Sequence, residues 1–396
     1  MKKSLFSLML GGVAIGMAEF MPMGLLPNIA ATLSVDVPSA GHLISAYALG
    51  VVIGAPLLAA FAMHFSVRQA FLGLLVSVGV FNLLFALAPT FELLFAARLF
   101  AGLPHGAFFG LGAVAASRLA EPGRETQAVS IMFAGLTVAN VMGVPLGTWI
   151  GHQLGWRFSF GLVAGLGLLA AWFVSRWMPA IAIGGEPRLA DNLGILRQPR
   201  LWLIILISAI GTGGLYAWIS YIAPLAVNVA GIPASQLSLV MIVAGLGMTL
   251  GNVLGGRIAD RFSPLPTTAA LLLCMSGALV VLTQTAHVTW VSWISTFVIG
   301  AIAFAVISPM QMLMIDFASG PKVFASCFIQ STSNIGNALG AYLGGVTIAA
   351  GWGYTGPEWA GAGLAAIGLC LSLPLLLMRG GKGAKARTGN PEAELR

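Results

Sequence analysis

Long apolar blocks, separated by short polar connections, run along the chain from its first residues to residue 378. Each of twelve blocks comes near the roughly 20 residues that a helix needs to cross about 30 Å of hydrocarbon. The connections carry Pro, Gly and most of the charge, and none is long enough to hold a folded soluble domain. The pattern predicts an all-α membrane protein with twelve transmembrane helices at about 5–28, 40–62, 69–88, 92–117, 126–150, 156–178, 201–226, 236–258, 266–286, 290–315, 323–350 and 359–378.

Composition excludes a water-soluble chain. Hydrophobic residues make up 58% of the sequence, charged residues 8%, and the mean hydropathy is +0.94. A soluble domain carries roughly a quarter charged residues, so this chain has too few polar groups to cover a surface in water. The basic start of the first block raises the alternative of a cleaved signal peptide, but Glu19, Pro22 and Pro27 inside a long apolar run favour a retained helix.

Basic residues predict the orientation in the membrane, because cytoplasmic loops accumulate Lys and Arg. Of the 19 basic residues, all but Arg98 and Arg157 fall on one side of the twelve predicted helices. Both termini are therefore expected in the cytoplasm, and the net charge of +7 reflects this bias rather than a nucleic-acid partner. The predicted organisation is a six-helix bundle at 1–178, a cytoplasmic linker at 179–200, a second six-helix bundle at 201–378 and a disordered cytoplasmic tail at 379–396.

An internal repeat joins the two halves at a constant offset of 197 residues. An offset that spans six helices gives both halves the same orientation, so the repeat is parallel. Parallel six-helix repeats place a substrate site between the halves, which rock against each other during transport. The matched residues are Gly16 with Gly213, Pro27 with Pro224, Gly50 with Gly247, Gly54 with Gly251, and Asn140, Gly143 and Gly147 with Asn337, Gly340 and Gly344.

The end of the eighth predicted helix carries Gly256, Asp260 and Arg261 in the run Gly-Arg-Ile-Ala-Asp-Arg-Phe. This run resembles the signature loop of the major facilitator superfamily. The copy in the first half is degraded, since Met63 stands where Asp260 stands in the second half. An Asp beside an Arg at a helix end favours a gate contact that holds one conformation, and the alternative is an anchor at the membrane interface.

Two charged residues are predicted inside the first half, Glu19 in the first helix and Arg98 in the fourth. A buried ionisable group in a membrane is expensive and marks a functional site by default. A helix rises 1.5 Å per residue, which places both residues at a similar depth in the membrane. We therefore expect them to meet. His105 follows Arg98 by seven residues on the same face and suits proton handling. We expect Glu19, Arg98 and His105 to couple protons, against the alternatives of a structural ion pair and a hydrogen-bonded core histidine.

The fifth predicted helix ends with Gly143, Pro145 and Gly147. The run resembles the Gly-Pro-rich motif of antiporters in the same superfamily, in a variant form. Small residues let helices approach closely, and a proline kink favours closure of the substrate path on one side. Close packing alone explains the same residues.

Polar residues that recur on one helix face predict a lined cavity between the halves. Amides beside aromatic rings suit a small, largely neutral, amphipathic ligand. Interhelical hydrogen bonding is the alternative for each of these residues. The predicted set is Thr137 and Asn140 on the fifth helix, Tyr216, Trp218 and Tyr221 on the seventh, and Gln330, Asn334 and Asn337 on the eleventh.

Three segments together resemble the drug:proton antiporter branch of the major facilitator superfamily, of the arabinose efflux permease type. They are 19–27, which contains Met23, 104–110, which contains Phe108, and 144–148. The resemblance implies the major facilitator fold and efflux in exchange for protons, and it adds Met23 and Phe108 to the predicted cavity. Sugars, nucleosides and chloramphenicol are the solutes credited to that group, and the resemblance leaves the choice open.

Other functions find less support in the sequence. An enzyme would need a catalytic constellation, and the chain has no phosphate loop, metal motif or nucleophile elbow. Cys274, Cys327 and Cys370 all fall in apolar blocks and imply no pairing or metal. A channel fits the repeat less well than alternating access does, and proton symport for uptake is the serious competitor. We expect a bacterial inner-membrane monomer whose partners are a small-molecule substrate, protons and lipid, with no cofactor.

Overall fold

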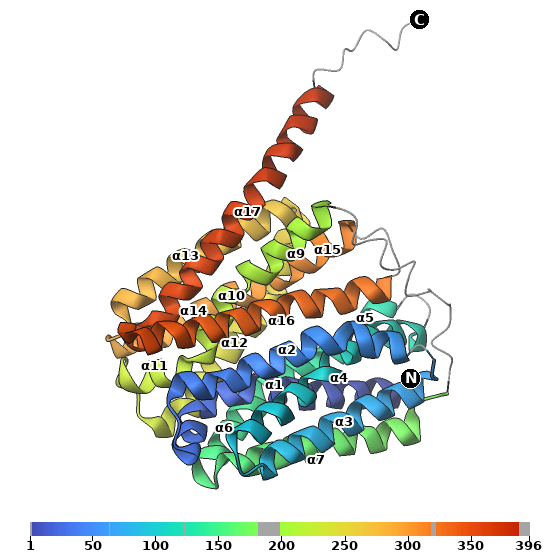
Figure 1. Cartoon of the computed structure of the whole chain (residues 1–396). Helices are drawn as coiled ribbons and strands as arrows, with labels where there is room; N and C mark the ends of the chain where they lie inside the picture. Colours follow the sequence, from blue (N-terminus) through green and yellow to red (C-terminus); the bar gives the residue numbers. More distant parts are fainter. Residues whose placement is uncertain (1, 63, 122–123, 181–198, 318–321, 388–396) are drawn as a thin grey trace, which may run out of the picture.

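The computed structural model describes residues 2–62, 64–121, 124–180, 199–317 and 322–387, with the side chains at 125–126, 199–200, 260, 314–317, 322–329 and 378–387 left aside. Every regular element in these ranges is a helix, and they contain no strand (Figure 1). The predicted linker lies mostly outside the described residues, as do Met63 and the last nine residues of the predicted tail.

The first half forms six helical passages. Ser66 caps α3 by accepting a hydrogen bond from the backbone N–H of Gln69. Asp36 accepts a hydrogen bond from the N–H of Ser39 at 2.8 Å, and its bonds to Ser39 hold the pKa of that carboxyl below its usual value. The helices are α1 (Lys2–Leu33), α2 (Val37–Ala62), α3 (Val67–Leu87), α4 (Phe91–Leu119), a fifth passage of α5 (Glu125–Val138), the π turn η1 (Ala139–Gly143) and α6 (Val144–Gln153), and α7 (Trp156–Trp177).

The second half repeats this plan with more breaks. Its seventh passage is divided at Thr212 and Tyr221, and its tenth at Val306. The elements are α9 (Pro199–Gly211), α10 (Gly213–Ser220), α11 (Ile222–Asn228), η3 (Ala234–Gln236), α12 (Leu237–Phe262), α13 (Pro264–Thr285), α14 (Thr289–Ala305), α15 (Ile307–Phe317), α16 (Lys322–Thr347), η4 (Ile348–Trp352), η5 (Gly353–Thr355) and α17 (Gly356–Arg387).

Eleven spans in the described residues are long and apolar enough to cross a membrane. The last of them, Gln330–Leu377, is 48 residues long and contains most of both α16 and α17. Between these helices the chain bends at Gly351 and Gly353, whose φ angles of 87° and 71° suit glycine. The fold therefore has eleven or twelve apolar helices.

The last helix differs from its predicted end. A disordered tail was expected from residue 379, but α17 continues to Arg387 and projects beyond the other helices (Figure 1). The expectation of disorder is thus wrong for 379–387. The helix continues through the glycines of this stretch, and its last four residues, 384–387, are the helix formers Ala, Lys, Ala and Arg, with no proline before Pro391.

Both halves use the same close approach of two helix backbones. A Cβ atom on Gly102 would collide with the carbonyl of Tyr47, and one on Gly300 would collide with the carbonyl of Ala244. Tyr47 and Ala244 are separated by the 197-residue offset. Glycine is therefore required at the crossing of α2 with α4 and at the crossing of α12 with α14, which supports the internal duplication.

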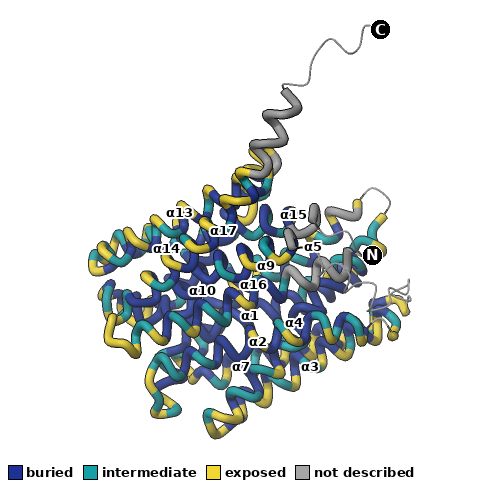
Figure 2. The backbone as a smooth tube through the Cα atoms, turned by 45° about the horizontal axis from the view of Figure 1, so that its top comes forward, coloured by how far each residue is buried: buried dark blue, intermediate teal, exposed yellow. Residues whose placement is uncertain are grey.

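Buried and exposed residues divide as expected for a bundle in lipid. Figure 2 shows buried positions on the inward faces and exposed positions on the outer faces of the helices. α1 is buried along most of its length. The outer surface carries large apolar side chains, among them Leu57, Phe61, Leu87, Met142 and Trp290. In water such a surface would be unfavourable, whereas hydrocarbon accepts it.

The two halves touch along α2 and α16, which lie side by side (Figure 1), and along α6, η1 and α12. The Ser45 hydroxyl donates to the Ala338 carbonyl at 3.1 Å, and the Ser331 hydroxyl donates to the Val52 carbonyl at 3.3 Å. Towards one end of this seam, the fully buried Tyr221 packs against Gly41 and donates to the Ala341 carbonyl at 2.8 Å. This end of the interface is closed.

Candidate functional site

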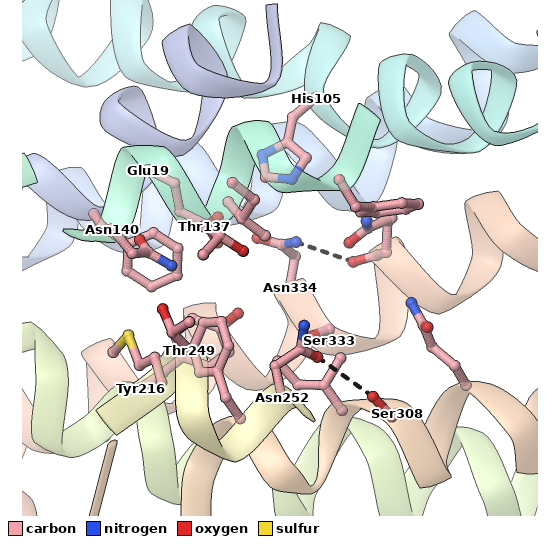
Figure 3. Close-up of a pocket in the computed structure, with 18 residues that line it drawn as sticks. Glu19, His105, Thr137, Asn140, Tyr216, Thr249, Asn252, Ser308, Ser333 and Asn334 are labelled. Atoms are coloured by element: carbon pink, nitrogen blue, oxygen red, sulfur yellow. Dashed lines mark hydrogen bonds between the residues drawn. The ribbon is translucent and has the colours of Figure 1, made fainter. Parts of the chain in front are cut away.

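A cavity of about 260 Å³ lies between the two halves (Figure 3). It lies toward the ends at which α5 and α16 begin, away from the end closed by Tyr221. Amide and hydroxyl groups dominate its polar lining, and Phe20, Phe133 and Phe304 supply aromatic surface. The lining residues are Glu19, Phe20, His105, Phe133, Leu136, Thr137 and Asn140 from the first half, and Tyr216, Met248, Thr249, Asn252, Phe304, Ile307, Ser308, Gln311, Gln330, Ser333 and Asn334 from the second.

Glu19 is the acidic residue among the described residues that line the cavity. Its side chain is 4% exposed. Asn337 donates from Nδ2 to Glu19 Oε1 at 3.3 Å, and the Tyr216 hydroxyl lies beside the same carboxyl group. Both partners belong to the second half, so this carboxyl group of the first half is held by groups of the other. A proton that binds or leaves Glu19 therefore changes a contact between the halves.

Arg98 lies beside this carboxyl group but forms no ion pair with it in the described part of the chain. The side chain is completely buried, with Nη1 donating to the Ala18 carbonyl at 2.8 Å and Nε donating to the Leu43 carbonyl at 3.3 Å. Its guanidinium carbon lies 4.3 Å from the centre of the Tyr47 ring. The charges of Arg98 and Glu19 are close enough to interact. Arg98 thus joins α1, α2 and α4 and supplies a positive field near Glu19.

His105 lines the same cavity as Glu19. Its Nδ1 lies 3.1 Å from the Tyr47 hydroxyl, in a hydrogen bond whose direction depends on the tautomer. Tyr47 therefore contacts both Arg98 through its ring and His105 through its hydroxyl. The three predicted proton-coupling residues lie in one buried region, and Tyr47 is the residue that joins two of them.

The polar face of α16 forms one wall of the cavity. Asn334 donates from Nδ2 to the Gln330 carbonyl at 3.0 Å, and its Oδ1 lies 3.5 Å from Asn337 Nδ2. Ser333 contacts the Tyr216 hydroxyl. Gln330, Ser333 and Asn334 line the cavity, whereas Asn337 lies behind the wall next to Glu19. Thr137 and Asn140 face this wall from the fifth passage (Figure 3).

Besides Asn337, four residues predicted for the cavity do not line it. Met23 and Trp218 are completely buried in apolar packing between helices, and Phe108 packs edge-to-face on Phe71 inside the first half. Tyr221 fills the closed end of the interface. Most positions of their helices are apolar, so the sequence does not reveal which of these apolar side chains reach the cavity.

The motif residues of the fifth passage serve close packing. A Cβ atom on Gly143 would lie 2.6 Å from Met17 Cγ, and one on Gly147 would collide with the Met21 sulfur. Pro145 lies in the first turn of α6, directly after the π turn. These residues let α6 and η1 lie against α1. The predicted closure of a substrate path stays a prediction.

The residues of the predicted gate loop make fewer contacts than the motif residues of the fifth passage. Gly256 faces open space, since a Cβ atom there would meet nothing within 4 Å. Arg261 is exposed and lies over the ring of Phe262, with 5.4 Å from its guanidinium carbon to the ring centre. The side chain of Asp260 lies outside the described residues. A gate contact at this loop also stays a prediction.

Five polar cavity residues were absent from the prediction, and one of them is Ser333 on α16. The other four form two pairs, with Thr249 and Asn252 three residues apart on α12 and Ser308 and Gln311 three apart on α15. Ser308 donates to Asn252 Oδ1 at 3.3 Å across these helices (Figure 3). The polar spacing that identified the fifth and eleventh helices also occurs here and would have found both pairs.

Comparison with known proteins decides the family. Residues 8–326 match the family model described as Major Facilitator Superfamily. The chain belongs to the major facilitator superfamily. It is 38% identical over 354 residues to the putative transporter AraJ of Escherichia coli K12, with 89% of this chain and 90% of that protein covered. It is 33% identical over 378 residues to a chloramphenicol resistance protein of Streptomyces lividans, covering 93% and 95%.

One further relative agrees with this assignment, and a solved structure shares the fold. A probable sugar efflux transporter of Helicobacter acinonychis is 28% identical over 350 residues, with 88% and 89% of the two chains covered. A solved bacterial homologue of the human lysosomal transporter Spinster, inward-facing and occupied, has a TM-score of 0.72 at 18% identity and covers 93% of this chain and 95% of its own. The chain is thus a multi-pass bacterial inner-membrane transporter of the drug and sugar efflux group.

Proposed function

We propose that this chain exports a small, largely neutral, amphipathic solute in exchange for protons by alternating access. The observation that carries the proposal is the position of Glu19, which lines the cavity, accepts a hydrogen bond from Asn337 of the opposite half and lies beside Tyr216 of that half. An ionisable group between two moving halves binds the proton with a different affinity in each of the two conformations. Coupling of proton movement to the conformational change requires such a difference. His105 and Arg98 lie in the same buried region as Glu19.

The lining supports a neutral, amphipathic solute. Amides and hydroxyls from α12, α15 and α16 offer hydrogen bonds without a fixed charge, and the aromatic rings offer apolar contact. The volume of about 260 Å³ lies just below the roughly 300 Å³ at which small-molecule pockets usually begin. Sugars, nucleosides and chloramphenicol all combine hydroxyl or amide groups with an apolar ring or face. The names of the relatives support export of this class.

The topology that we infer has twelve helices and two cytoplasmic termini. A span of 48 residues would be about 72 Å long as one helix, roughly twice the thickness of the hydrocarbon core, which supports two crossings by α16 and α17. The excess of basic residues on one side of the twelve predicted helices supports cytoplasmic termini. With this orientation the cavity faces the cytoplasm and Tyr221 closes the periplasmic end. One chain encloses the whole cavity, so we propose a monomer with bundles at 1–178 and 201–378.

Transport into everted membrane vesicles tests the proposal. Vesicles with an acid interior would be given arabinose and other sugars, nucleosides and chloramphenicol, each as a labelled solute. We expect at least one of these solutes to accumulate inside, and we expect a proton ionophore to abolish the accumulation. Vesicles without the chain serve as the control. Accumulation only in right-side-out vesicles with an acid exterior would mean uptake by symport, and accumulation in neither would overturn proton coupling for these solutes.

A further inference from the structure

Asn337 joins the buried carboxyl group to the polar wall of the cavity without lining the cavity itself. Its Nδ2 lies 3.3 Å from Glu19 Oε1 and 3.5 Å from Asn334 Oδ1. The side chain is completely buried, and Asn334 is a wall residue. The Asn337 amide nitrogen therefore donates both to Glu19 in the first half and to Asn334 in the cavity wall.

The oxygen of the same amide has no partner. Asn337 Oδ1 is buried and makes no hydrogen bond in the described part of the chain. A buried acceptor without a donor costs free energy, so its persistence beside a proton-binding group calls for an explanation. An ionised carboxylate only accepts hydrogen bonds, whereas a protonated carboxyl group has one O–H to donate. Asn337 Oδ1 is an acceptor that this O–H can use.

We propose that Asn337 is a positioning residue that couples protonation of Glu19 to the cavity wall by reversing its side-chain amide. While Glu19 is ionised, Nδ2 donates to Glu19 and to Asn334 and holds Asn334 in the wall. A proton taken from water stays on Glu19, whose O–H then donates to Asn337 Oδ1. The amide rotation that permits this bond withdraws Nδ2 from Asn334.

The direction of this effect fits exchange rather than symport, and the inference rests on the proposed proton exchange. An ordered Asn334 favours solute binding when Glu19 has lost its proton. Protonation releases Asn334 and favours solute release. Solute and proton thus compete through the wall, which is the relation that antiport needs.

Tyr216 contacts Glu19 as well, but it does not need to move. Its hydroxyl both donates and accepts, so it can bond to either protonation state of the carboxyl group from one position. An amide has its donor and acceptor on different atoms. The requirement to rotate therefore falls on Asn337.

A test without any solute follows from reciprocity: if protonation of Glu19 changes the wall, a change in the wall must alter protonation of Glu19. The purified full chain would be treated with a carbodiimide, which modifies protonated carboxyl groups, over a range of pH. Mass spectrometry would give the pH of half-modification at Glu19. The set is wild type, Asn334→Ala, Asn337→Leu and the double variant.

We expect Asn337→Leu to move this midpoint about one pH unit toward alkaline values, because the ionised form loses a donor. Asn334→Ala should move the midpoint by about half a unit in the wild-type background and leave it unchanged in the Asn337→Leu background. The matched control is Asn82→Leu. Asn82 is a completely buried asparagine of α3 that donates to the Val78 carbonyl and whose Oδ1 is also unpartnered in the described residues. It should leave the midpoint unchanged.

The outcomes separate the inference from the proposed function. An equal effect of Asn334→Ala in both backgrounds, or in neither, would overturn the role of Asn337 while Glu19 still titrates. Modification of wild-type Glu19 that does not depend on pH would remove the proton site and overturn both. If Asn337→Leu fails to fold, Asn337→Ser takes its place, since a serine is too short to bridge Glu19 and Asn334 and predicts the same loss.

Discussion

Glu19 and Tyr216 lie side by side in the cavity lining although they stand 197 residues apart and hold the same position in the two halves. The duplication thus brings two matched positions together at the interface. One of them carries an ionisable carboxyl group and the other a hydroxyl that serves as its partner. A symmetric fold has become asymmetric at the point where proton exchange is proposed.

Substitution of Gly251 should destabilise the bundle, whereas substitution of Gly256 on the same helix should not. A Cβ atom on Gly251 would collide with the Ala301 carbonyl, and one on Gly256 would meet nothing within 4 Å. We expect Gly251→Ala to lose about 1–3 kcal/mol of stability through overpacking. Thermal unfolding of the purified protein in detergent measures the difference. Equal transition temperatures for Gly251→Ala and Gly256→Ala would mean that α12 and α14 are further apart.

Replacement of Arg98 by lysine should be damaging even though the charge is kept. Arg98 uses two nitrogen atoms to bond the carbonyls of Ala18 and Leu43, and an ammonium group on a flexible stem does not reproduce this planar fork. We expect a loss of about 2 kcal/mol in thermal unfolding, the range of a charged hydrogen bond. Arg157→Lys is the control, because Arg157 is only partly buried. If Arg98→Lys matched wild type, simple charge neutralisation of Glu19 would be its role.

Linking α2 to α16 should stop transport. The Ser45 hydroxyl lies 3.1 Å from the Ala338 carbonyl across the two halves. In a background without the three native cysteines, Ser45→Cys with Ala338→Cys should be joined by a short bifunctional thiol reagent. We expect transport to be lost on cross-linking and to be unaffected in either single-cysteine variant. Full transport by the cross-linked protein would show that α2 and α16 do not separate at Ser45 and Ala338 during transport.

Much of the fold was readable from the sequence, because the thickness of a bilayer fixes the length of an apolar helix. The breaks inside passages were not predicted, although the sequence carries a signal near each of them. Gly211 and Gly213 flank Thr212, while Pro224 and Pro309 follow Tyr221 and Val306 by three residues and remove one helical hydrogen bond each. The 197-residue offset did pair Gly50 with Gly247 and Gly54 with Gly251, and at all four positions a Cβ atom would collide with a backbone carbonyl of the facing helix.

The site was readable where polar residues broke an apolar face. Asn140 and Asn334 were identified this way, and the same signal would have found Asn252. Phe108 entered the prediction through the family resemblance, and it packs on Phe71 although His105, three residues earlier on α4, lines the cavity. Arg98 was expected at the depth of Glu19, and its bond to the Ala18 carbonyl agrees with that depth. The direction of its guanidinium depends on carbonyl acceptors that a sequence does not display.

Proton-driven transport by Glu19→Gln tests proton exchange at this carboxyl group most directly. The variant would be compared with wild type in everted vesicles, for proton-driven accumulation and for exchange of labelled against unlabelled solute without a gradient. The control is Glu358→Gln, since Glu358 is equally buried but lies outside the cavity lining. We expect Glu19→Gln to lose proton-driven accumulation and keep solute exchange, with Glu358→Gln like wild type. Proton-driven accumulation by Glu19→Gln at the wild-type rate would contradict proton exchange at Glu19.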